Sequence, residues 1–106
     1  MPKYLITGSY TSAGAKGVLA KGGSDRRAAV EKLAESVGGT VDTFYFAFGG
    51  DDIVTIIDAP DNESVAAVTM TVGASGMVDI RTTVLLTPEE VDGAAKKSVS
   101  YRGPGQ

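Results

Sequence analysis

The chain has 106 residues and a formal net charge of −3, so it is long enough for one domain with a modest core and too short for two. It contains no cysteine and no histidine, which excludes disulfides, zinc–thiolate sites and Ser-His catalysis. Its basic residues are scattered and no apolar run approaches the roughly 18 residues of a membrane span, so we expect a cytoplasmic protein that binds neither nucleic acid nor membrane.

The first predicted elements are a strand and two helices. The strand covers Lys3 to about Tyr10, and a short helix is expected from Thr11 to about Lys21, where Gly22-Gly23 interrupts it. Ser24 is the expected cap of the main helix, which should end at Gly38-Gly39. Apolar residues recur along this helix at Val30, Leu33, Ala34 and Val37.

Residues 44–58 follow as a β-hairpin that is apolar on both faces. A half-exposed antiparallel strand alternates apolar and polar residues, yet only Thr55 interrupts the run from Ile53 to Ile57. Both faces of the sheet therefore need cover. The helices can cover one face, and a second copy of the chain most simply covers the other, so we expect a homodimer or a higher homo-oligomer.

The length of the hairpin loop decides which side chains share a face. A loop of two or four residues places one set together: Phe44, Phe46, Phe48, Ile53, Thr55 and Ile57. The opposite set is then Thr43, Tyr45, Ala47, Asp52, Val54, Ile56 and Asp58. A bulge of one residue would reverse the pairing. The first set suits packing under helices, and for the second we favour contact with a partner copy over a ligand pocket.

After the hairpin, another helix is expected from Asp61 to about Ser75, and a fourth strand from Asp79 to Leu86. The segment Thr87-Pro88-Glu89-Glu90 predicts a capping box and a short helix from Pro88 to about Lys97, followed by a loose or partner-draped tail over residues 98–106. This order predicts an α+β, ferredoxin-like βαββαβ fold, with an antiparallel sheet, helices on one face and an extra C-terminal helix.

Four segments carry a resemblance to a known family: Tyr4–Thr7, Ala28–Glu31, Phe44–Gly49 and Thr83–Glu90. With them the chain resembles the bacterial GYD domain family over essentially its whole length. The family is named for a Gly-x-Tyr-Asp-like turn between its central strands, and here Asp51 stands at the tyrosine position. The resemblance implies kinship with the dimeric α/β barrel group, whose members pair sheet against sheet and include cofactor-free monooxygenases, isomerases and haem enzymes.

The candidate ligand-binding residues are Tyr10, Tyr45, Asp52 and Arg81. Tyr10 and Tyr45, together with Tyr4, could supply phenol groups as oxygenases of this fold class do, and Arg81 could hold an anion. Tyrosines in sheets more often pack their ring and bond their hydroxyl to water or backbone.

Other clusters are weaker candidates. Arg26-Arg27 could attract a carboxylate or phosphate, but a charged pair on an exposed first turn is usually solvated. The acids between Asp51 and Asp61 lack the spacing of a calcium loop, and Gly8–Gly17 lacks that of a phosphate loop. We therefore expect no metal and no cofactor.

Three functions are compatible with these features. We favour a homo-oligomeric binding or assembly module without enzymatic activity, which holds a small apolar or aromatic molecule between sheet and helices. One alternative is a cofactor-free monooxygenase or isomerase that uses the candidate residues in the same cavity. Another is a regulatory interaction protein that recruits a partner through its C-terminal helix and Tyr101-Arg102. A cavity lined by polar groups would favour catalysis.

Overall fold

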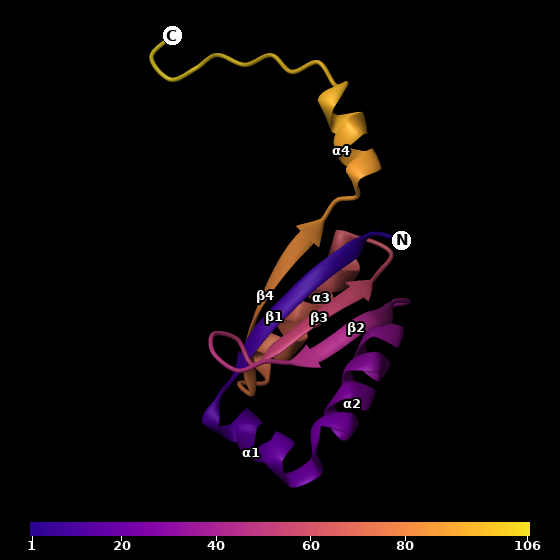
Figure 1. Cartoon of the computed structure of the whole chain (residues 1–106), viewed down its shortest axis with the longest axis vertical. Coiled ribbons are helices and arrows are strands. Elements are labelled where there is room, and N and C mark those ends of the chain that lie inside the picture. Colours follow the sequence, from indigo (N-terminus) through magenta and orange to yellow (C-terminus); the bar gives the residue numbers. More distant parts are fainter.

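The computed structural model describes residues 1–106 and has the element order β1 α1 α2 β2 β3 α3 β4 α4 (Figure 1). The strands are β1 (Lys3–Tyr10), β2 (Thr40–Phe46), β3 (Ile53–Asp58) and β4 (Val78–Leu85). The helices are α1 (Ser12–Lys21), α2 (Gly23–Glu35), α3 (Asn62–Ala74) and α4 (Pro88–Ala95). The predicted α+β, ferredoxin-like fold with an extra C-terminal helix is confirmed.

The four strands form one antiparallel sheet in the order β2-β3-β1-β4. Helix α2 packs beside β2 and α3 packs beside β4, on the same face of the sheet (Figure 1). No helix of the chain covers the opposite face, which we call the open face. It is lined by Leu5, Thr7, Tyr45, Val54, Ile56, Arg81, Thr83 and Leu85.

The loop between β2 and β3 covers residues 47–52, because Phe46 pairs with Ile53, and it is longer than the two or four residues predicted but has the same even parity. The predicted division of the paired hairpin residues between two faces is therefore confirmed. A shift in register leaves Asp42 as a bulge near the far end of β2, where it does not disturb this division. Phe48 lies in the loop itself and is fully exposed, so it packs under no helix.

The helix boundaries show one wrong prediction and one confirmed. Gly22, at φ +86°, separates α1 from α2 and is the N-cap of α2, so the predicted cap at Ser24 is wrong. Glycine adopts this left-handed backbone without steric cost, and the new helix can therefore start directly after the break. At α4 the capping box is present: Glu90 N–H donates to Thr87 Oγ1 at 3.1 Å, and Thr87 N–H donates to Glu90 Oε1 at 3.0 Å.

The core consists of two buried clusters on the helix-covered face. One contains Tyr4, Ile6, Ile57, Ala59 and Val65. The Tyr4 hydroxyl donates to Asn62 Oδ1 at 2.7 Å, which satisfies the polar end of this buried ring. The other cluster contains Phe44, Ile53 and Val78, with Val30 and Val72 packed against it. Both helices touch this second cluster, but α2 packs chiefly along β2 and α3 along β4, at opposite edges of the sheet.

The end of the chain projects away from the sheet beyond β4 (Figure 1). Every residue from Leu86 to Arg102 is exposed, including Val99 and Tyr101. The predicted draping of residues 98–106 over a partner stays a prediction. None of the helices combines the length and apolar character needed to cross a membrane.

Candidate functional site

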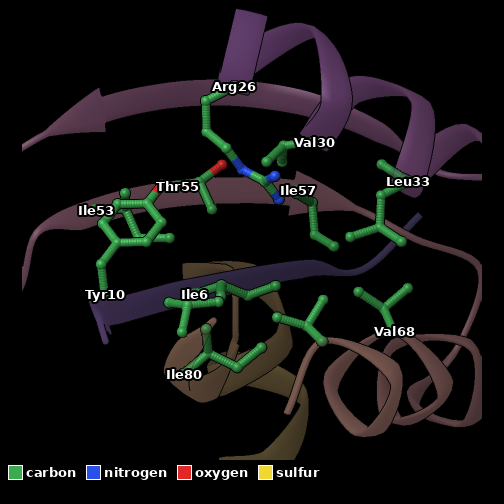
Figure 2. Close-up of a pocket in the computed structure, with 13 residues that line it drawn as sticks. Ile6, Tyr10, Arg26, Val30, Leu33, Ile53, Thr55, Ile57, Val68 and Ile80 are labelled. Carbon is green, nitrogen blue, oxygen red and sulfur yellow. The ribbon is translucent and has the colours of Figure 1, made fainter. Parts of the chain in front are cut away.

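An apolar cavity of about 40 Å³ lies between α2, α3 and the helix-covered face of the sheet (Figure 2). Of its 13 lining residues 11 are hydrophobic, so apolar side chains dominate its walls. The strands contribute Ile6, Ile53, Ile57, Val78 and Ile80, and the helices contribute Val30, Leu33, Ala34, Val68 and Val72. This space exists because α2 and α3 are anchored at opposite sides of the sheet.

A wider cleft of about 520 Å³ adjoins this cavity and is bounded by α1, α2, α3 and the start of β4. Five residues line both spaces: Tyr10, Arg26, Leu33, Val72 and Val78. The cavity is thus the inner end of the cleft. A volume of this order falls within the range of about 300–1,000 Å³ that small-molecule sites occupy.

Three polar side chains reach the inner cavity, and two of them are unengaged. The Thr55 hydroxyl donates to the Thr43 carbonyl at 2.6 Å. The Tyr10 hydroxyl oxygen is buried and makes no hydrogen bond of good geometry, although the Arg26 side chain lies near enough to affect the pKa of the phenol. Figure 2 shows the Arg26 side chain running from α2 into the same space, and its guanidinium makes no ion pair. A ligand would therefore meet a phenol and a guanidinium close to each other on an otherwise apolar surface.

The protonation of Tyr10 follows from its surroundings. Burial raises the pKa of the phenol above its usual 10.0; the positive charge of Arg26 and hydrogen bonding with its side chain oppose this rise, and the carboxylate of Asp52 adds to it. Because the net shift is upward, the hydroxyl is neutral at ordinary pH and available as a hydrogen-bond donor.

The structure brings two of the four predicted ligand-binding residues together. Asp52 Oδ2 accepts from the Tyr10 backbone N–H at 2.8 Å, so Asp52 positions the end of β1 from which the Tyr10 ring reaches the cavity. Tyr45 is 68% exposed on the open face. Arg81 lies on the same open face, where its guanidinium binds the carboxylate of Asp51. Tyr45 and Arg81 are therefore separated from Tyr10 by the sheet.

Arg26 is the cavity residue that the sequence reading undervalued. The helical spacing contained a signal, because Arg26 precedes Val30 by four residues and Leu33 by seven and so shares their buried stripe. Arg27 does not line the cavity. Its Nε lies 3.7 Å from Oε1 of Glu31, one turn later, and the two form a solvated surface pair. The two arginines therefore have different roles despite being adjacent.

The open face has no such recess but carries apolar side chains across all four strands. Leu5, Val54, Ile56 and Leu85 are only partly buried there, with Tyr45 beside them. Ion pairs flank the face: Lys3 Nζ lies 2.9 Å from Asp58 at one end, and Arg81 meets Asp51 at the other. An apolar centre with a charged rim is the usual composition of a protein–protein interface.

No three acidic side chains converge closely enough to hold a metal ion. The fold and the site thus define a ferredoxin-like domain with a ligand-sized cleft on its helical side and an uncovered sheet on the other. The GYD domain of the protein-family comparison matches residues 4–95, and the chain belongs to the GYD domain family. Comparison with curated proteins and with solved structures gives no match.

Proposed function

We propose that this GYD protein is a homo-oligomeric module that binds a small, largely apolar molecule between its helices and its sheet. The observation that carries the proposal is that the apolar cavity and the 520 Å³ cleft share a wall of five residues, beside a cleft lining in which 8 of 16 residues are hydrophobic. Concave, mostly apolar sites with a few convergent polar groups are the usual form of small-molecule sites.

The open face supports the homo-oligomeric part of the proposal. Leu5 and Ile56 are cross-strand neighbours at its centre, and both remain accessible in the isolated chain. Partly accessible apolar patches on a sheet favour association, because burying them completely removes the remaining apolar surface from water. A second copy can present the same face about a two-fold axis.

Binding without catalysis is the function that the geometry supports better. Of the residues considered for a cofactor-free monooxygenase or isomerase, only Tyr10 directs its hydroxyl into the cavity, while Tyr45 and Arg81 lie across the sheet. A proton-transfer reaction needs its groups within reach of one substrate.

Ligand binding can be tested with 2-naphthamide, a neutral aromatic probe, by isothermal titration calorimetry. Val72→Phe fills the junction of cavity and cleft and should weaken binding at least about tenfold, because the probe and the new ring compete for one space. Val91→Phe on the exposed helix α4 is the matched control and should leave binding unchanged. Equal loss in both variants, or no binding by the wild type, would contradict the proposed site.

Assembly is tested by sedimentation at micromolar concentration. We expect the wild type to sediment as an oligomer and Ile56→Lys to sediment as a folded monomer, because a charge at the centre of an interface must be desolvated. Val99→Lys in the exposed tail is the control. A stably folded wild-type monomer would refute the homo-oligomeric proposal.

A further inference from the structure

The two free donors of the cleft point to the chemical class of its ligand. We infer that the cleft selects compounds with an apolar body and one carboxylate, which Arg26 binds through its guanidinium and Tyr10 through its hydroxyl. This inference rests on the proposed function, since it specifies the ligand of the same site. The Tyr10 hydroxyl makes no hydrogen bond of good geometry within the chain, and Arg26 forms no ion pair.

The charge balance around Arg26 favours an anion. Of the nearby carboxylates, Asp51 pairs with Arg81 on the other face, and Asp52 accepts from the Tyr10 backbone. Two cations, Lys21 and Arg26, and one carboxylate, Asp25, line the cleft, and none of the three forms an ion pair. The lining therefore carries one net positive charge, and Arg26 is the cation beside the apolar walls, where a counter-ion is bound more strongly than in water.

The geometry of the donors favours a carboxylate over other anions. A guanidinium presents parallel N–H groups that match the two oxygens of a carboxylate, and a neutral phenol can donate a third hydrogen bond. A phosphate dianion would bring two negative charges to a cleft whose lining carries one net positive charge, because Asp25 lies there together with Lys21 and Arg26. A monoanionic head group fits the balance of charges.

The walls determine where the rest of the ligand lies. Arg26 and Tyr10 line both the cavity and the cleft, so the carboxylate would sit at their junction. Leu33, Val72 and Val78 line the same junction and offer an apolar surface to the body of the ligand. The inner cavity of about 40 Å³ admits only the edge of a ring or a short alkyl group. The larger part of the body would occupy the outer cleft.

A matched pair of probes tests the inference: 2-naphthoate and the neutral, nearly isosteric 2-naphthamide. Wild-type protein should bind the carboxylate at least about tenfold more tightly, as expected for a charge-assisted hydrogen bond. Arg26→Gln should abolish this preference and leave the affinity for 2-naphthamide within about twofold. Arg27→Gln, one residue away and facing solvent, should keep the full preference.

Each outcome has a distinct meaning. If neither probe binds the wild type, the proposed function fails. If both bind equally well, or if Arg27→Gln loses as much preference as Arg26→Gln, small-molecule binding stands and the carboxylate inference is overturned. Displacement of 2-naphthoate by inorganic phosphate at millimolar concentration would overturn the choice of carboxylate. Arg26→Lys, which keeps the charge but not the parallel donors, should retain part of the preference for the carboxylate. This result would show that Arg26→Gln acts by removing the charge and not by misfolding the protein.

Discussion

The same substitution at two glycines of α1 should change stability in opposite directions. Gly14 is buried, and a Cβ built there would lie 1.9 Å from the Met77 carbonyl oxygen. At Gly17, one turn along, no atom lies within 4 Å of the added Cβ. Both positions are inside the helix, so alanine brings the same gain in helix propensity at each, about 1 kcal/mol. The difference between the two variants therefore isolates the contact with Met77.

The loss of stability in Gly14→Ala can be estimated from the hydrogen bonds that hold α1 against the segment before β4. Thr11 N–H donates to Met77 O at 3.0 Å, and the Thr11 hydroxyl donates to Gly76 O at 2.8 Å. To accept the methyl group of Gly14→Ala, the helix must move away and lose these two bonds, at about 0.5–1.5 kcal/mol each, or the site must tolerate overpacking of about 1–3 kcal/mol. After the propensity gain of about 1 kcal/mol, we expect a net loss of about 0–2 kcal/mol, centred near 1 kcal/mol. Gly17→Ala should gain about 1 kcal/mol.

Urea unfolding followed by circular dichroism measures both values. All variants are compared at one protomer concentration, because the apparent stability of an oligomer depends on it. If Gly14→Ala proves as stable as Gly17→Ala, α1 does not pack closely against the Met77 backbone. The helix would then not form a fixed wall of the cleft.

Two further predictions concern single side chains. Tyr10→Phe removes a hydroxyl that has no partner, so the free energy of unfolding without ligand should stay the same or rise by up to about 1 kcal/mol; a clear loss would reveal a partner for that hydroxyl. The hydrogen bonds from Ser64 hold the pKa of Asp61 below its usual 3.8, so the stabilisation by this helix cap is present above that pH and lost as the pH falls through the lowered pKa. Asp61→Asn keeps a capping oxygen that does not titrate, and its urea midpoint should therefore fall less steeply than that of the wild type below about pH 4. Parallel midpoint curves for both proteins would contradict this assignment.

Much of the fold could be predicted because local patterns determine it. The apolar run of β3, which only Thr55 interrupts, predicts the strand, and the capping box at Thr87 predicts the first residue of α4. The start of α2 was misplaced because its cap is a backbone conformation of Gly22 and not a side-chain hydrogen bond. The sequence shows that a glycine is present, but it does not reveal which φ angle that glycine adopts.

The site was less predictable because it depends on long-range packing. Parity within the hairpin assigns Tyr45 to one face of the sheet. Tyr10 belongs to β1, and no hairpin turn connects β1 to β3. The sequence therefore does not determine the register between these two strands, or the residues that face Tyr10. The cleft itself arises from the separate anchoring of α2 and α3, which no local pattern encodes. Arg26 therefore stands out only when its helical stripe is placed over the sheet.

The burial of β3 limits how this protein can diverge. None of its residues is exposed, even though one side of the strand has no cover within the chain. Thr55 faces the cavity while its neighbours Val54 and Ile56 face outward. A ligand would thus restrict which side chains are tolerated at one set of alternate β3 residues, and a partner copy would restrict the other set. The sequences of relatives should therefore vary least in β3 and most in the projecting residues after β4.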